Sequence, residues 1–154
     1  LIDGRASRVS SLKKGNMIVN SNGDIATIVC VIKTKIKWGY TNMLSIGGLK
    51  VTPWHPIRHN GKWEFPANIG KIKLIKCDYV YNFVLDKHHV MTVNGIDVIT
   101  LGHGMNDDPV LRHPFFGTEK VINDLKSHPS WNNGMIVFNE YKPKYENNLI
   151  ASMC

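Results

Sequence analysis

The chain has 154 residues, of which 43% are hydrophobic and 20% are charged, and its formal net charge is +7. This length and composition fit one folded domain with a sizeable core and exclude a disordered chain. The apolar runs are too short for a transmembrane helix. Leu1 leads directly into Asp3-Gly4-Arg5, and nothing in this start reads as a signal peptide.

Much of the positive charge comes from two groups of lysines, Lys33, Lys35 and Lys37, and Lys71, Lys73 and Lys76. Alternate positions place the first group on one face of a strand, where lysines hinder edge-to-edge pairing. Trp38 is the one aromatic residue beside them, so the pattern lacks the interleaved aromatics that stack bases. We therefore expect a solvated lysine edge and no nucleic-acid binding.

The cysteines indicate a reducing compartment. Cys30, Cys77 and Cys154 include no Cys-x-x-Cys pair, which argues against a disulfide framework or a zinc knuckle. Cys30 and Cys77 stand in apolar, strand-like runs, so we expect two buried thiols. On this basis we expect a cytoplasmic protein.

Four Asn-Gly pairs punctuate the sequence. Asn-Gly favours two-residue hairpin turns because both residues tolerate positive φ. The pairs are Asn22-Gly23, Asn60-Gly61, Asn94-Gly95 and Asn133-Gly134. The flanking segments that we expect to be strands are 17–19 and 25–32, 51–57 and 62–65, 89–93 and 96–101, and 135–138.

A long strand and one helix complete the pattern. Residues 79–85 carry apolar side chains on both faces and are expected to be largely buried. A helix is expected at about 119–127, where Thr118 can cap the first turn and His128-Pro129 ends the pattern. Its apolar stripe consists of Val121, Ile122 and Leu125.

No repeat or linker divides the chain. The strand pattern is interrupted at residues 103–114, which contain Asn106-Asp107-Asp108-Pro109. We therefore expect a single mainly β domain over residues 1–154, with a core at 1–102 and an extension at 103–154 that contains the short helix.

The segment Val51-Thr52-Pro53-Trp54-His55-Pro56-Ile57 carries most of the chemistry. In a straight strand, Thr52 and His55 would point to opposite faces. Pro53 fixes φ, and Pro56 disfavours the α region at His55, so a bent strand end is expected instead. There, an imidazole can protonate a leaving amine while a hydroxyl holds a polarised carbonyl. An edge strand with an ordinary surface histidine is the alternative.

Histidines raise the question of a metal site. His55 and His59 have the spacing of a zinc pair on a helix, but the prolines and Asn60-Gly61 exclude a helix there. We expect neither a metal nor another cofactor. His103, between two glycines, is a further catalytic candidate, and close backbone packing is the alternative for it.

With these elements in place, the chain resembles the Hint fold of inteins and hedgehog autoprocessing domains. It is most similar to the Vint branch, which occurs in proteins with von Willebrand factor type A domains. The core resemblance rests on three segments: Asp3-Gly4 through Leu12-Lys13-Lys14-Gly15-Asn16-Met17-Ile18, Thr52-Pro53-Trp54-His55-Pro56-Ile57, and Val80-Tyr81-Asn82-Phe83-Val84-Leu85 through His89 and Val93-Asn94-Gly95-Ile96. The Vint branch is indicated by Trp63, Phe65-Pro66, Thr100-Leu101-Gly102-His103-Gly104 and His113-Pro114-Phe115-Phe116-Gly117-Thr118.

The resemblance implies a hairpin-built β fold with a pseudo-twofold arrangement, and cleavage of a peptide bond in the domain's own chain. A cysteine or serine attacks the preceding carbonyl and converts the amide to a thioester or ester. Thr52 and His55 match the residues that hold the scissile amide and protonate its nitrogen. His89 matches a later histidine that assists downstream steps. Asn82 stands where the family has Asp or Cys, and its amide can orient groups but cannot accept a proton at neutral pH.

Two departures from the family pattern change the expected reaction. Inteins end in His-Asn, whose asparagine cyclises, whereas Ile99 and Thr100 stand here and the chain continues. A hedgehog-like cleavage is therefore the better analogy. The resemblance also places the attacking residue upstream of Leu1, so we expect the chain by itself to be inactive. Cys154 has no acyl group of the required connectivity to attack.

Other functions remain open. A catalytically inactive Hint-shaped interaction module is the main alternative, and a metallohydrolase or nuclease is a weaker one. The tryptophans Trp38, Trp54, Trp63 and Trp131 could cover a binding surface, although we expect each to pack in the core. The expected partners are the flanking polypeptide as substrate and a small second nucleophile (water, a thiol or a lipid alcohol), with the domain as a monomer.

Overall fold

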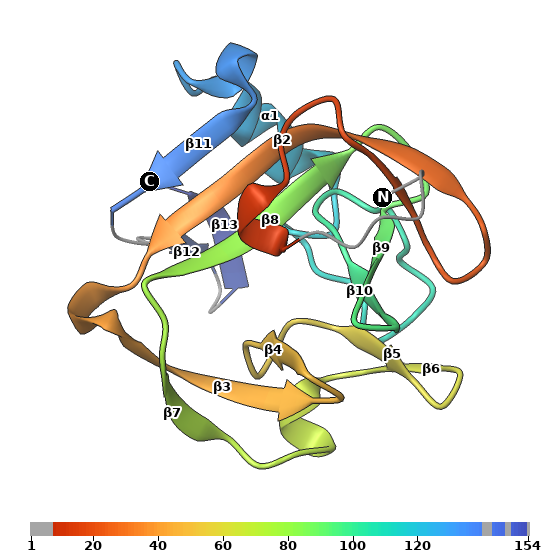
Figure 1. The fold of residues 1–154 in the computed structure, drawn as a ribbon. Helices are drawn as coiled ribbons and strands as arrows, with labels where there is room; N and C mark the ends of the chain where they lie inside the picture. The colour runs from red at the N-terminus through yellow and green to blue at the C-terminus, as the bar shows by residue number, and fades with distance from the viewer. Residues whose placement is uncertain (1–7, 140–142, 147–148, 154) are drawn as a thin grey trace.

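The computed structural model describes residues 8–139, 143–146 and 149–153. As predicted, the chain is mainly β, and within the described residues it has one α-helix, near the C-terminal end (Figure 1). Asp3-Gly4 and Cys154 lie outside the described residues. The strands are β1 (Met17–Val19), β2 (Ile25–Lys35), β3 (Tyr40–Ile46), β4 (Leu49–Val51), β5 (Ile57–His59), β6 (Lys62–Glu64), β7 (Lys73–Lys76), β8 (Tyr79–Leu85), β9 (Val90–Val93), β10 (Ile96–Ile99), β11 (Met135–Phe138), β12 (Pro143–Glu146) and β13 (Leu149–Met153). The helix α1 spans Glu119–Lys126, and the short 3-10 helices η1 to η4 span Val9–Ser11, Lys37–Gly39, Pro66–Asn68 and Trp131–Asn133.

Strand β2 lies inside a four-stranded sheet rather than at its edge (Figure 1). It pairs antiparallel with β1 and β8 and parallel with β11. At Lys33, the register partners are Tyr81 on one side and Val137 on the other. The predicted lysine edge was therefore wrong, because strands that come much later in the sequence occupy both sides of β2.

An irregularity in β2 lets this strand contribute to two hydrophobic clusters. The register with β8 shifts between Ile28 and Cys30. Ile28 and Val31 belong to the cluster that joins β2 to β4, β5 and β10, whereas Cys30 and Ile32 belong to the cluster that includes α1. A bulge inserts one residue and so changes which positions face each side of the strand. All four side chains are buried.

Three of the four Asn-Gly pairs lie in hairpins, as predicted. Asn60-Gly61 and Asn94-Gly95 turn with positive φ at both residues, between β5 and β6 and between β9 and β10. Asn22-Gly23 lies in the 20–24 loop between β1 and β2. The fourth prediction was wrong: Gly134 ends η4 with a φ of 78°, and β11 then pairs parallel with β2. Gly134 thus adopts the left-handed conformation that ends a helix, and it does not form a hairpin turn.

Helix α1 forms where the sequence predicts it. Thr118 Oγ1 accepts a hydrogen bond from the Lys120 backbone N–H at 3.3 Å, and the Val121 and Leu125 side chains are buried against residues of β2, β8 and β11. The described helices include none that is long and apolar enough to cross a membrane. The extension also contains an antiparallel pair, β12 with β13, which the sequence did not predict.

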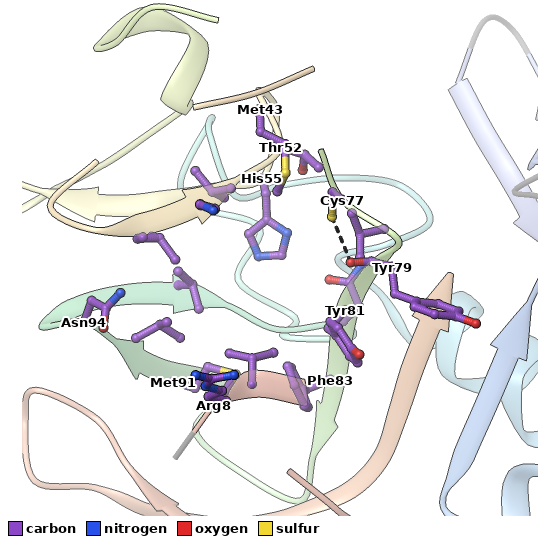
Figure 2. A pocket seen from close by; sticks show the side chains of 18 of the residues that line it. Arg8, Met43, Thr52, His55, Cys77, Tyr79, Tyr81, Phe83, Met91 and Asn94 are labelled. Atoms are coloured by element: carbon purple, nitrogen blue, oxygen red, sulfur yellow. Dashed lines mark hydrogen bonds between the residues drawn. The ribbon is translucent and has the colours of Figure 1, made fainter. Parts of the chain in front are cut away.

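The strands surround a pocket of about 640 Å³ (Figure 2). Residues of β4 and of the turn after it line one side, β8 lines another, and the β9–β10 hairpin closes a third. Arg8 and Val9, at the start of the described chain, also line this pocket. The pocket therefore lies where the early and middle parts of the sequence meet.

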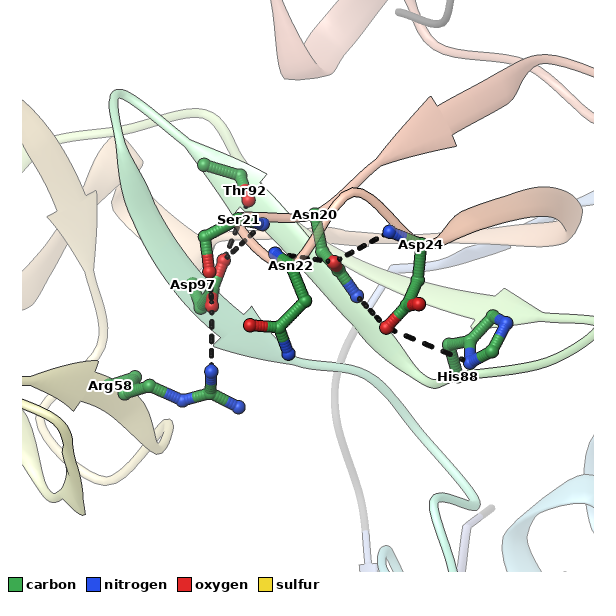
Figure 3. A network of polar contacts seen from close by, with 8 residues as sticks. All are labelled: Asn20, Ser21, Asn22, Asp24, Arg58, His88, Thr92 and Asp97. Carbon is green, nitrogen blue, oxygen red and sulfur yellow. Dashed lines mark hydrogen bonds and ion pairs between the residues drawn. The ribbon is translucent and has the colours of Figure 1, made fainter.

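A buried carboxylate fastens the β9–β10 hairpin to its surroundings (Figure 3). Asp97 accepts hydrogen bonds from the Ser21 N–H at 3.2 Å, the Ser21 hydroxyl, and the Thr92 hydroxyl at 2.6 Å, and it pairs with Arg58 at 3.2 Å. Burial raises the pKa of Asp97, but these hydrogen bonds and Arg58 outweigh burial and hold the pKa below its usual value. Asp97 lies on β10, and its contacts thus link this strand to the first hairpin loop, to β5 and to β9.

We predict that Asp97→Asn lowers the free energy of unfolding by about 1–3 kcal/mol, because an amide cannot satisfy every donor that faces the carboxylate. Urea unfolding at pH 7 would measure this loss. Asp107→Asn makes the same chemical change at an exposed position and should leave the free energy of unfolding nearly unchanged.

The loss from Asp97→Asn should also depend on pH in a defined direction. A carboxyl with a lowered folded pKa stabilises the protein above its unfolded pKa of about 3.9, and this contribution disappears as the pH falls through the folded value. The difference between the parent and Asp97→Asn should therefore shrink below about pH 4. A difference that grows on acidification would contradict the assignment.

A second prediction concerns the contact between α1 and the core. A Cβ on Gly102 would lie 2.5 Å from Ile122 Cγ1, whereas a Cβ on Gly104 would meet nothing within 4 Å. The two glycines have nearly equal φ, 67° and 69°, so Gly104→Ala is a matched control for backbone strain. Gly102→Ala should cost about 1–3 kcal/mol more than Gly104→Ala in chemical unfolding. Equal losses in the free energy of unfolding would show that α1 does not pack closely against Gly102.

Candidate functional site

The turn between β4 and β5 bends as the prolines predict. Strand β4 ends at Val51, and the His55 N–H donates to the Thr52 carbonyl at 3.3 Å. The Pro53 carbonyl accepts from the Ala67 N–H at 2.9 Å, which ties the turn to η3. Thr52 and His55 both line the pocket, and in Figure 2 the His55 ring reaches into it.

A backbone carbonyl holds the His55 ring. Its Nε2 lies 2.8 Å from the Ile99 carbonyl oxygen at the end of β10. A carbonyl oxygen only accepts, so Nε2 carries the hydrogen, and in the neutral ring Nδ1 has the lone pair. Loss of hydration around the ring lowers the pKa of His55, and the bond to Ile99 offsets this only in part. His55 is therefore a neutral ring with one nitrogen left for chemistry.

Strand β8 supplies the opposite wall of the pocket. Asn82 and its neighbours Tyr79, Tyr81 and Phe83 line it. The Phe83 carbonyl accepts from the Leu101 N–H at 3.1 Å, which joins β8 to the segment after β10. Among the described residues that line the pocket, none is an Asp or Glu. His55 is thus the lining group that is suited to move a proton near neutral pH.

Cys77 lines the pocket, whereas the sequence predicted a buried thiol. It is only partly buried, and its thiol donates to the Tyr79 carbonyl at 3.0 Å (Figure 2). Burial raises the pKa of Cys77, so the thiol stays protonated at neutral pH. Cys30 is fully buried as expected, and burial raises its pKa to about 11. The expectation of two buried thiols therefore holds for Cys30 alone.

His89 is not among the residues that line this pocket. Its carbonyl accepts from the Thr100 N–H at 2.9 Å, so it is adjacent to the end of β10 that holds His55. Within the described part of the chain, two buried atoms here lack a hydrogen-bond partner, His89 Nδ1 and Thr100 Oγ1. Desolvation lowers the pKa of His89, and nearby His88 lowers it further.

His103 also lies outside the pocket, beside the extension. Its Nδ1 accepts from the Met105 N–H at 2.9 Å, and the Nδ1 of His113 accepts from Phe115 and Phe116 at 3.1 and 3.0 Å. Burial lowers the pKa of both rings. Both histidines thus contact loop backbone, and the catalytic role of His103 stays a prediction.

Two further histidines, His59 and His88, make separate contacts with acidic side chains. His59 pairs with Glu64 at 3.2 Å, and His88 lies 3.9 Å from Asp24. In residues 8–139, no group of three or more His, Cys, Asp or Glu side chains is arranged to hold a metal.

The sequence did not predict two groups that strand pairing brings to the pocket, the Ile99 carbonyl and Cys77. The Ile99 carbonyl carries no side-chain signal, and nothing near Cys77 in the sequence points toward His55. Tyr79, Tyr81 and Phe83 did carry a signal, because their alternate spacing places them on the same side of a strand. That spacing does not say which side of β8 faces the pocket.

Comparison with known proteins bears on the family. A search of curated proteins finds no significant match to this chain. Among protein-family models, the chain matches Vint, described as a Hint domain, over residues 1–151. The match spans nearly the whole chain and agrees with the mainly β fold and the single described helix. The chain therefore belongs to the Vint family of Hint domains.

Proposed function

We propose that this domain cleaves the peptide bond at its own N-terminal junction through an acyl shift that converts the scissile amide to a thioester or ester. Membership in a Hint family supports an autoprocessing role in general terms. The observation that carries the specific proposal is that Thr52, His55 and Asn82 line the same pocket. The flanking polypeptide is the substrate, and the domain acts as a monomer that uses only groups of its own chain for this first step.

The hydrogen bond to Ile99 sets the order of proton transfers. Because Nε2 already carries a hydrogen, the Nδ1 lone pair of His55 first takes the proton of the attacking thiol or hydroxyl. The new bond from sulfur or oxygen to the carbonyl carbon forms as the carbon–nitrogen bond breaks. Nδ1 then gives the same proton to the leaving amine. The Ile99 carbonyl stabilises the positively charged ring between these transfers.

Thr52 and Asn82 would act without exchanging protons. A hydroxyl can donate to the carbonyl oxygen as negative charge develops there, which lowers the barrier to attack. The Asn82 amide can donate and accept hydrogen bonds at once and so orient the scissile group. The attacking cysteine or serine would come from residues that precede Leu1 in the natural protein.

Thr100 supports cleavage without asparagine cyclisation. It occupies the position at which inteins have the cyclising asparagine, and threonine has no side-chain amide that could attack the backbone. It is also buried, and its N–H donates to the His89 carbonyl. Release would therefore depend on a second nucleophile (water, a thiol or a lipid alcohol) that attacks the ester or thioester. His89, adjacent to the end of β10, would assist this later step.

One prediction tests the proton order directly. In ¹⁵N NMR of the histidine rings at pH 7, His55 should be neutral, with the hydrogen on Nε2 and none on Nδ1. It should remain neutral below its ordinary pKa of 6.5, because desolvation disfavours the charged ring. A hydrogen on Nδ1 at pH 7 would rule out its role as the first proton acceptor.

A second prediction tests the reaction. The chain is extended into its natural upstream residues, with a reporter protein fused before the nucleophile. DTT or hydroxylamine should then release the reporter, since both attack a thioester far faster than an amide. His55→Ala should slow release by roughly 10²–10⁴-fold. Thr52→Ala should cost less, at most about 3–4 kcal/mol in the barrier.

His59→Ala is the matched control, because His59 pairs with Glu64 and does not line the pocket. It should change the release rate by no more than a few fold. Added imidazole should restore part of the rate of His55→Ala, which a loss caused by misfolding would not show. If the reporter stays attached to the intact domain, or if His55→Ala releases it at the parental rate, the chain would instead be a Hint-shaped interaction module.

A further inference from the structure

Large apolar side chains are exposed on the part of the molecule that is built from η2, β3 and β7. The exposed fractions are 84% for Trp38, 69% for Leu74, 53% for Tyr40 and 44% for Ile72. Trp38 was expected in the core, and that prediction was wrong, as it was for Trp54, which is 66% exposed. The backbone of Trp38 has a φ of 66°, a left-handed conformation that bulky residues rarely adopt. The chain thus holds a tryptophan outward at a turn where glycine would fit better.

Pairing of β3 with β7 places several of these residues on one face. Tyr40 is opposite Lys76, and Asn42 is opposite Leu74. Opposite residues in an antiparallel pair point to the same face, so Tyr40 and Leu74 are diagonal neighbours there. Trp38 precedes Tyr40 by two residues, and the Lys37 Nζ lies 5.3 Å from the centre of its ring. We call Tyr40, Leu74 and Lys76, together with exposed Trp38 of the adjoining η2, the β3–β7 face. In Figure 1, β3 and β7 lie together at the lower left, away from α1 and β11.

The same segments carry almost all of the net charge. Residues 33–50 and 71–81 contain seven lysines and one acidic residue, Asp78, which is a net charge of +6 out of +7 for the whole chain. Lys35, Lys37, Lys71, Lys73 and Lys76 are exposed. Flexible lysine stems let the ammonium groups reach toward an anionic surface from around the edge of the β3–β7 face.

We propose that the β3–β7 face binds an anionic lipid bilayer surface, with Trp38 and Leu74 entering the interface and the lysines contacting the headgroups. Tryptophan and tyrosine favour the boundary between headgroups and acyl chains. Each lysine near an anionic membrane adds to the electrostatic free energy of binding. A nucleic acid fits less well. Leu74 and Ile72 cannot stack on bases, and this region has no arginine to form paired hydrogen bonds with phosphates or guanine.

Vesicle binding tests this proposal with the protein as it stands. The chain should sediment with phosphatidylcholine vesicles that contain phosphatidylserine and not with pure phosphatidylcholine, and added salt should weaken the binding. Lys35→Gln, Lys37→Gln and Lys76→Gln should each weaken it by about fivefold. The control Lys120→Gln with Lys126→Gln removes charge from α1, on another part of the molecule, and should have little effect. If the α1 lysines matter as much as the others, net charge alone would explain the binding and the proposal fails.

Trp38→Gly separates docking from folding. Glycine relieves the left-handed backbone, so this variant should unfold no more easily than the parent while it loses vesicle affinity and the blue shift of tryptophan fluorescence. Leu74→Ser should also weaken binding, whereas Val137→Ser, at a residue of 47% exposure on β11, should not. Unchanged affinity in Trp38→Gly and Leu74→Ser would overturn the proposal. So would binding to single-stranded RNA that is tighter than vesicle binding at the same salt concentration.

Discussion

The hydrogen-bonded ladder along β2 is the constraint on which the rest of this structure depends. β2 is the strand that β1, β8 and β11 all join, and it carries the shift in register that divides its buried side chains between two clusters. One cluster supports the strands around the pocket, and the other holds α1. Because β8 is fixed on β2, its other edge is presented to the pocket. The position of the candidate site therefore follows from how β2 is paired.

Within the pocket, a single backbone group decides what His55 can do. The imidazole has two nitrogens, and either could carry the hydrogen in the free side chain. The Ile99 carbonyl removes that choice and points the remaining lone pair elsewhere. Ile99 reaches this place because β10 pairs with β5, which starts just after His55. The turn that contains His55 and the carbonyl that orients this histidine are thus held by the same sheet.

The family match and the local geometry support different parts of the functional argument. The match assigns the chain to the Vint family of Hint domains, and with it a general autoprocessing role. The pocket adds which of the candidate residues line it, Thr52, His55 and Asn82, and which do not, His89 and His103. Two buried side-chain atoms without a hydrogen-bond partner, His89 Nδ1 and Thr100 Oγ1, distinguish the end of β10 from the open pocket. The lysine-rich β3–β7 face is a separate feature, with its own chemistry and a separate proposed partner.

The sequence by itself determined the local features. Asn60-Gly61 and Asn94-Gly95 make hairpin turns, Thr118 caps α1, and the prolines bend the chain between Thr52 and His55, because each of these depends on residues a few positions apart. The tertiary structure decided the parallel pairing of β11 with β2, the hydrogen bond between His55 and Ile99, the place of Cys77 in the same pocket, and the exposure of Trp38. Backbone groups are the same at every residue, so sequence pattern cannot say which distant strand or carbonyl a segment will meet. Only packing of the whole chain selects among those partners.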